Sequence, residues 1–118
     1  MWSLEESPSL VKIYDLLYHL GSSGSYVGFY YVSYAVWLCV QCPERLLLVT
    51  KWLYPNVAAH YDTNWKAVER GIRTMINRIW QNDPRILTEV TGYPVKERPG
   101  PSQFLSILVR YLLSGGAA

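Results

Sequence analysis

Between positions 66 and 77, polar residues of the types that bind DNA recur at helical spacing. At 100° per residue, five side chains fall within an arc of about 100° on one face of a helix: Lys66, Glu69, Arg70, Arg73 and Asn77. An arginine can donate two hydrogen bonds to a guanine, a glutamate can accept one from a cytosine, and cations neutralise phosphates. The pattern therefore indicates a helix that reads the DNA major groove. A solvated surface helix, in which Glu69 and Arg73 form an i,i+4 ion pair, is the simpler alternative.

The opposite face of this helix and the residues before it favour the DNA-binding interpretation. An apolar stripe on that face predicts packing against a core: Val68, Ile72, Met75, Ile76 and Ile79. The stretch 55–61 predicts a short helix with proline in its first turn, and Asp62-Thr63-Asn64 predicts a tight turn with an N-cap. Together with a long helix over about 64–81, these elements form a helix-turn-helix. Such turns often contain glycine, so Asp62 or Asn64 has to take its place.

The predicted DNA-binding residues come from two elements. They are Trp65, Lys66, Glu69, Arg70, Arg73 and Thr74 on the long helix, and Lys51 in the segment that supports it. Base contacts are assigned to the long helix. Lys51 is expected to contact a phosphate, which positions a protein on DNA without reading sequence.

Cys39 and Cys42 form a Cys-x-x-Cys motif, a pattern typical of zinc sites and redox pairs. The sequence has no second such motif, and neither His19 nor His60 lies at zinc-finger spacing. A redox pair of the thioredoxin type requires a βαβ context, which the pattern lacks. We therefore expect two reduced thiols in a buried helix, with no metal and no cofactor. No Ser/His/Asp set, glycine-rich phosphate loop or carboxylate pair stands out, so an enzyme is not predicted.

The length of 118 residues fits one domain spanning 1–118. The net charge of +2 is small, but residues 51–85 hold six Lys/Arg against three Asp/Glu, a net charge of +3 on the predicted helix-turn-helix. The acidic N-terminus has no apolar core segment, so no signal peptide is expected. The longest apolar run, over 26–40, is shorter than the roughly 20 residues that span a membrane. A cytoplasmic protein without membrane contact is expected.

The rest of the chain predicts further helices. Ser7-Pro8 is expected to start the first one. Residues 29–42 have strand propensity but do not alternate, and no other segment predicts a strand partner, so a buried helix is expected there. Pro43 is expected to begin a third helix, Gly92 to close a short one, and Ser102 to cap the last. The predicted fold class is all-α, a compact bundle of about six helices.

Within this helix order, several short motifs resemble one protein family. They are Thr50-Lys51, Leu53-Tyr54-Pro55, Val68-Glu69-Arg70, Ile72-Arg73 and Trp80. From about residue 26 to residue 112, the chain resembles the C-terminal effector domain of the sporulation stage-zero response regulator, a bacterial transcription factor. The combination of these motifs is more specific than a generic helix-turn-helix. The resemblance implies an all-α domain of six helices with its long helix in the major groove of a short DNA box.

Carried over to this chain, the resemblance assigns base contacts to Glu69 and Arg70, with Arg73 on the same face. Three positions depart from the family. Ala67 stands where the family has arginine, Lys66 where it has serine, and Trp65 where it has a small residue. The single ammonium group of Lys66 cannot reproduce a bidentate arginine contact. A different preferred box or weaker base readout is therefore expected.

The expected function is sequence-specific transcription regulation, with a role in sporulation. The expected partner is double-stranded DNA, and a sigma factor of RNA polymerase and a second copy of the chain on DNA are further candidates. The family protein also carries an N-terminal receiver domain, for which residues 1–25 are too few. The alternative is a protein-interaction module that kept the fold and lost base readout. The substitution at Ala67, the modest charge and the tyrosine-rich second helix are compatible with that alternative.

Overall fold

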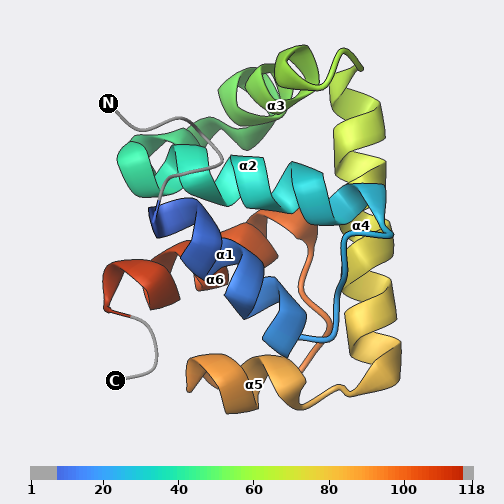
Figure 1. The fold of residues 1–118 in the computed structure, drawn as a ribbon, viewed down its shortest axis with the longest axis vertical. Coiled ribbons are helices and arrows are strands. Elements are labelled where there is room, and N and C mark those ends of the chain that lie inside the picture. Colours follow the sequence, from blue (N-terminus) through green and yellow to red (C-terminus); the bar gives the residue numbers. More distant parts are fainter. Residues whose placement is uncertain (1–7, 116–118) are drawn as a thin grey trace.

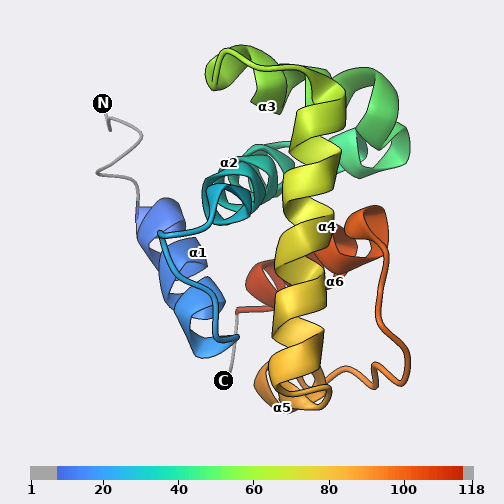
Figure 2. The same ribbon diagram turned by 90° about the vertical axis from the view of Figure 1, so that its right-hand side faces the viewer.

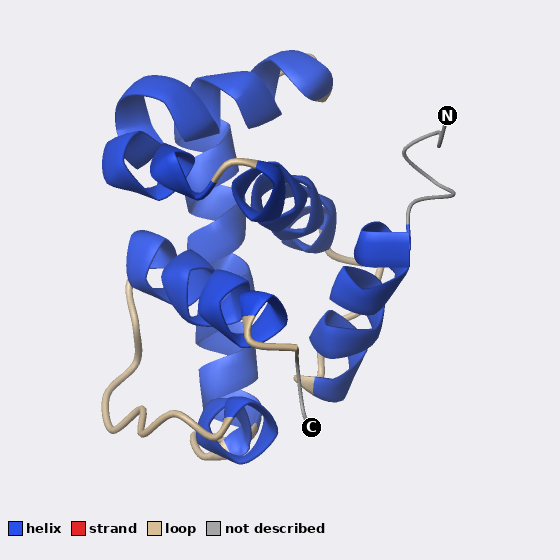
Figure 3. Cartoon of the chain, turned by 90° about the vertical axis from the view of Figure 1, so that its left-hand side faces the viewer, coloured by secondary structure: helices blue, strands red, loops and turns tan. Residues whose placement is uncertain are grey.

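The computed structural model describes residues 8–115. All regular secondary structure in this range is helical (Figure 3). Six α-helices occur in this range: α1 (Pro8–His19), α2 (Val27–Gln41), α3 (Tyr54–His60), α4 (Trp65–Asn82), α5 (Ile86–Thr91) and α6 (Pro101–Leu113). No strand occurs among residues 8–115, so the predicted all-α class is confirmed. Ser7, the expected cap of the first helix, lies outside the described residues.

Helix α2 lies at the centre of the fold and packs against α1, α4 and α6 (Figure 1). Its side chains Phe29, Val32, Ala35 and Val36 are at most 1% exposed. A helix enclosed on several sides needs apolar residues around most of its circumference, which is why no clear periodicity marks it in the sequence. The expected buried helix over 29–42 is confirmed within one or two residues at each end.

Helices α2 and α4 touch through two glycines. A Cβ atom on Gly28 would overlap the backbone carbonyl oxygen of Gly71, and a Cβ atom on Gly71 would lie 2.8 Å from the Tyr31 ring. Neither glycine has a positive φ, so conformational freedom is not the reason for glycine at these positions. Glycine is required because the two helices approach too closely for a side chain. This contact fixes the position of α4 against the centre of the fold.

The turn between α3 and α4 uses the two residues that the sequence singles out. Asp62 has a φ of 55° and takes the left-handed conformation that glycine often supplies. Asn64 is the N-cap of α4, and its side-chain oxygen accepts a hydrogen bond from the backbone N–H of Ala67 at 2.9 Å. The phenol of Tyr61 donates to the backbone oxygen of Tyr30 at 3.1 Å and so ties α3 to α2. The predicted helix-turn-helix is confirmed as a fold element.

The stretch before α3 is not the regular helix that the sequence predicts. Pro43–Leu48 forms a 3₁₀ helix and Val49–Leu53 a π-helical turn that leads directly into α3. Pro55 supplies the physical reason, because a proline ring clashes with the carbonyl four residues earlier, here that of Lys51. The wider turn avoids this clash, and the N–H of Tyr54 donates instead to the oxygen of Val49, five residues back.

The last helix begins two residues earlier than predicted. Gly100 is its N-cap and Pro101 its first residue, so the expected capping by Ser102 is wrong. Proline is favoured at the first helical position because it needs no hydrogen bond to its nitrogen there. Gly92, with a φ of 78°, ends α5 as predicted. None of the helices within residues 8–115 is long and apolar enough to cross a membrane.

Candidate nucleic-acid interface

Helix α4 presents one polar face to solvent and buries the other. Lys66, Arg70, Arg73 and Thr74 are exposed, and Glu69 is half-buried. The predicted apolar stripe is at most 4% exposed: Val68, Ile72, Met75, Ile76 and Ile79. Figure 2 looks onto the outer side of α4, with the α1–α2 loop on one side and the segment that leads to α6 on the other. The predicted two-faced helix is therefore confirmed, and its polar face is accessible to a large partner.

The exposed arginines of α4 are held by different contacts. Arg73 lies 3.8 Å from the Glu69 carboxylate, and the two side chains are 56% and 37% exposed. An exposed i,i+4 pair of this kind is worth only about 0.3–0.5 kcal/mol, so a partner can separate it at little cost. Arg70 has no ion-pair partner among residues 8–115. Its guanidinium can therefore bind a partner without first losing an internal ion pair.

The first turn of α4 adds an aromatic ring to this surface. Trp65 is 38% exposed, and the Nζ atom of Lys66 lies 5.8 Å from the centre of its ring. This cation–π contact is long, so it holds the ammonium group weakly. Thr74 lies one turn beyond Arg70 on the same side of the helix. All six predicted residues of α4 are thus exposed or half-buried within its first ten residues.

Lys51 lies on the π-helical turn that leads into α3. It is exposed, and its neighbour Thr50 lines a cleft of about 400 Å³ together with Glu69 and Arg73. The N-terminus of α6 forms the other wall of this cleft through the residues from Gly100 to Gln103. The residue before Lys51 thus meets the flank of α4 that carries Glu69 and Arg73, while Lys51 itself does not line this cleft.

Tyr54 lines the same cleft as Glu69 and Arg73. It is 2% exposed, and its burial raises the pKa of the phenol to about 12, with a smaller contribution from the Glu69 carboxylate. Both effects disfavour the phenolate, so the phenol is neutral at physiological pH. The base of the cleft therefore adds no negative charge to a surface that would face phosphates.

Arg78 is a candidate that sequence reasoning missed. It lies on the flank of α4 that faces the α1–α2 loop, 5.2 Å from the ring centre of Tyr26, and its Nη1 atom donates to the Tyr26 phenol at 3.4 Å. Periodicity places Arg78 outside the polar arc of 66–77, and no local pattern connects it with residue 26. Only the packing of α2 against α4 brings the two together.

The cysteines show no reactive arrangement. Cys39 and Cys42 are free thiols, and burial raises the pKa of Cys39 to about 12, which suppresses the nucleophilic thiolate. Within residues 8–115, no group of three or more His, Cys, Asp or Glu side chains could hold a metal ion. His60 stacks on Tyr34 with ring centres 3.9 Å apart and serves packing between α2 and α3.

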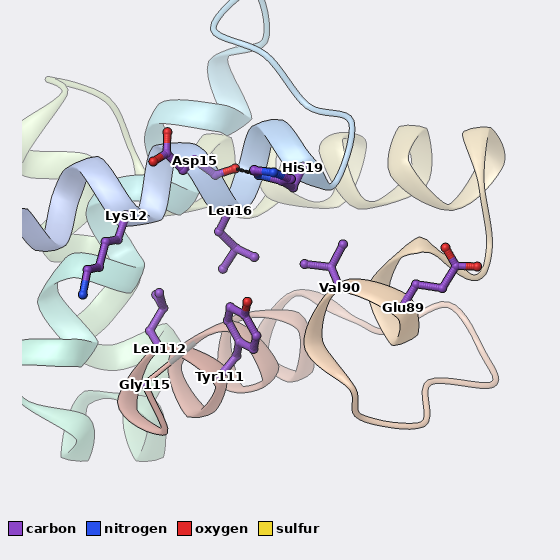
Figure 4. A pocket seen from close by; sticks show the side chains of 9 residues that line it. All are labelled: Lys12, Asp15, Leu16, His19, Glu89, Val90, Tyr111, Leu112 and Gly115. Carbon is purple, nitrogen blue, oxygen red and sulfur yellow. Dashed lines mark hydrogen bonds between the residues drawn. The ribbon is translucent and has the colours of Figure 1, made fainter. Parts of the chain in front are cut away.

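A separate pocket of about 470 Å³ lies between α1, α5 and α6 (Figure 4). Leu16 and Val90 lie in its middle, while Lys12 and Glu89 lie towards opposite ends. The Nδ1 atom of His19 is already bonded to the backbone oxygen of Asp15 at 2.7 Å. The charged groups do not converge on one point, as catalysis would require, and no α4 residue lines this pocket.

A helix-turn-helix with a buried stripe and an accessible cationic face on its second helix defines a class of DNA-binding domain. Residues 13–112 match the family described as sporulation initiation factor Spo0A, C terminal. The match covers most of the chain, and the protein belongs to this family. It is a DNA-binding domain of the kind that regulates transcription in sporulation. The resemblance inferred from the sequence motifs is confirmed.

Proposed function

We propose that the protein binds specific DNA sequences by placing α4 in the major groove. The observation that carries the proposal is the exposure of Lys66, Arg70 and Arg73 along one side of a helix whose other side is buried. In this arrangement Arg70 donates two hydrogen bonds to a guanine, and Glu69 accepts one from the amino group of a cytosine. Arg70 is the stronger specificity determinant, because its guanidinium is rigid and bidentate.

The other predicted residues have supporting roles in this proposal. Arg73 leaves its exposed pair with Glu69 to contact DNA, which also frees the carboxylate for a base. Lys66 and Thr74 contact the phosphate backbone or base edges at the two ends of the polar face, and Trp65 packs against the backbone near the first turn of α4. Lys51, exposed on the π-helical turn before α3, contacts a phosphate and sets the register of the protein on DNA.

Ala67 affects the preferred sequence. It is half-buried beside Arg70 and lines a cleft with Ser25 and Thr74, and its methyl group cannot form the contact of the arginine that the family carries at this position. Lys66 supplies a charge next to it but only one donor group. We therefore expect a DNA box that differs from that of the family by at least one base preference.

In the cell, we propose a cytoplasmic transcription regulator that acts in sporulation, with residues 1–118 as one DNA-binding unit. A sigma factor of RNA polymerase is the proposed protein partner, and a second copy of the chain is the proposed neighbour on DNA. Both assignments rest on the family to which the chain belongs.

A second candidate function is a protein-interaction module. The observation in its favour is the exposure of large apolar side chains in the irregular stretch before α3, where Leu47 is 79% and Trp52 52% exposed. Exposed apolar patches often mark protein interfaces. The two functions differ in a simple observable, because an interaction module would have no preferred DNA sequence.

Selection from a pool of random DNA duplexes tests the proposal. The purified protein is expected to enrich a short motif over successive rounds and to bind it at least about a thousandfold more tightly than unrelated DNA. A matched selection with the triple variant K66A/R70A/R73A is expected to enrich nothing. Equal binding of all sequences by the wild type, or no binding at low salt, would favour the interaction module.

A further inference from the structure

The flank of α4 that faces the α1–α2 loop carries a polar cleft. Its volume is about 370 Å³, and its lining residues are Gly21, Ser22, Tyr26, Met75, Arg78, Ile79, Gln81 and Asn82. The loop crosses beside the C-terminal half of α4 at this point (Figure 2). The cleft has a guanidinium, two amide side chains and a phenol at its edge. No carboxylate lines it.

The guanidinium of Arg78 is held in place without being neutralised. It lies over the Tyr26 ring at 5.2 Å and uses one N–H in the bond to the phenol at 3.4 Å, whereas arginine has five N–H donors. Arg78 is exposed and forms no ion pair within residues 8–115. It therefore keeps both its charge and most of its donors for an anion.

A second observation points to a ligand in the same cleft. Ser22 is 5% exposed, and its Oγ atom has no hydrogen-bond partner among the residues that the structure describes. A buried hydroxyl without a partner costs free energy, and an oxygen atom that enters the cleft would provide one. Tyr26 is also the N-cap of α2, a helix of 15 residues, so the positive end of the α2 dipole lies next to the cleft.

We infer that Arg78, positioned by Tyr26, binds a phosphate of the DNA backbone on the side of α4 opposite Glu69. The inference rests on the proposed placement of α4 in the major groove. A helix in that groove lies between two phosphate backbones, which run along its two flanks. Arg78 follows Arg70 by eight residues, or about 12 Å along the helix axis, and lies about 80° around it. Arg78 therefore contacts one strand from its flank of α4 while Glu69 and Arg70 face the bases.

The salt dependence of DNA binding tests this assignment. Arg78→Gln is expected to reduce the slope of log K against log salt concentration by about 0.9, the contribution of one phosphate contact. With that slope, the affinity at 0.1 M salt falls about eightfold, by the same factor on the preferred duplex and on a scrambled one. Arg78→Lys keeps the charge, so it is expected to retain the wild-type slope. Tyr26→Phe keeps the ring and is expected to lower the affinity by a smaller factor, with the slope unchanged.

Arg110→Gln is the matched control. Arg110 is an exposed arginine on α6 that contacts the ring of Tyr93 at 5.4 Å, so this variant loses the same charge and the same kind of aromatic contact away from α4. It is expected to bind as the wild type does. A wild-type slope for Arg78→Gln, or an equal loss for Arg110→Gln, would overturn the inference while leaving the proposed function intact. No DNA binding by the wild type would instead overturn the proposed function and this inference with it.

Discussion

The three arginines of α4 have different neighbours, and these neighbours separate their proposed roles. Arg73 is paired with Glu69, Arg78 is held by Tyr26, and Arg70 has no ion-pair partner within residues 8–115. A charge that is already fixed lowers the cost of a phosphate contact, whereas Arg70 has no internal ion pair to lose before it contacts a base. The surroundings of Arg70 and Arg78 match this division.

The structure also predicts that the thiol of Cys39 is unreactive. Burial raises the pKa of its thiol from 9.0 to about 12, so only a minute fraction is thiolate at pH 8. With iodoacetamide at pH 8, the native protein is expected to be alkylated at Cys42, which is half-buried, and at Cys39 only after unfolding in urea. Peptide mass spectrometry before and after unfolding measures this.

The variant Cys42→Ser provides the control, because its native form is expected to take up no label. Labelling of Cys39 in the native Cys42→Ser variant as fast as in urea would show that α2 opens readily and that the thiol is not protected.

Individual residues also show what the sequence could and could not predict. Asn64 and Asp62 act as expected because capping and left-handed turns depend on a few adjacent residues. Arg78 was missed because its contact with Tyr26 spans 52 positions and depends on how α2 crosses α4. The prediction that Ser102 caps the last helix was wrong because two local start signals compete there. The helix begins at Gly100-Pro101 and not at Ser102.

The contact between α2 and α4 determines where α4, the proposed DNA-reading helix, lies. Gly28→Ala is expected to lower the free energy of unfolding by about 3 kcal/mol or more, at the upper end of the range for overpacking. The reason is that the added methyl group meets the backbone of Gly71, which cannot move aside as a flexible side chain does. Urea denaturation followed by circular dichroism measures the change.

Gly100→Ala is the matched control for that substitution. No atom lies within 4 Å of a Cβ placed on Gly100, and its φ of −76° suits alanine. This variant is expected to change stability by less than about 1 kcal/mol, the usual range for an N-cap change from glycine. Equal stability of Gly28→Ala and Gly100→Ala would show that α2 and α4 do not meet at the glycines.

The elements differ in how well periodicity predicts them. The stripe of α4 was predicted in full because one side of the helix is solvent and the other is core. The helix expected to begin at Pro43 is not regular, and Leu47 within it is 79% exposed. Pro55 changes the hydrogen-bonding pattern of the residues before it. Composition alone also does not determine whether an apolar residue is buried in the core.

For the whole molecule, the buried ionisable groups predict a loss of stability in alkali. Burial raises the pKa of Tyr54 and of Tyr61 to about 12, from an ordinary value near 10. In the unfolded chain these phenols lose their protons near pH 10, so unfolding becomes more favourable above that pH. Stability should therefore be unaffected by these phenols below about pH 10 and fall steadily between pH 10 and 12.

Urea titrations at pH 9, 10, 11 and 12 measure this dependence. Tyr61→Phe removes one of the two phenols and also its bond to Tyr30, so it is expected to be about 1 kcal/mol less stable at pH 9 and to lose less stability in alkali. A stability that stays constant from pH 9 to 12 in the wild type would contradict the burial of both phenols.

The central claim is that the outer face of α4 reads base sequence, and the ratio of specific to random DNA affinity tests it most directly. For Arg70→Ala, a loss of about 1–3 kcal/mol is expected on the selected duplex but little on a random one, so the ratio falls and one base position loses its preference. For Lys51→Ala, both affinities fall together and the ratio is unchanged. An equal loss on both duplexes for Arg70→Ala would contradict base readout by α4.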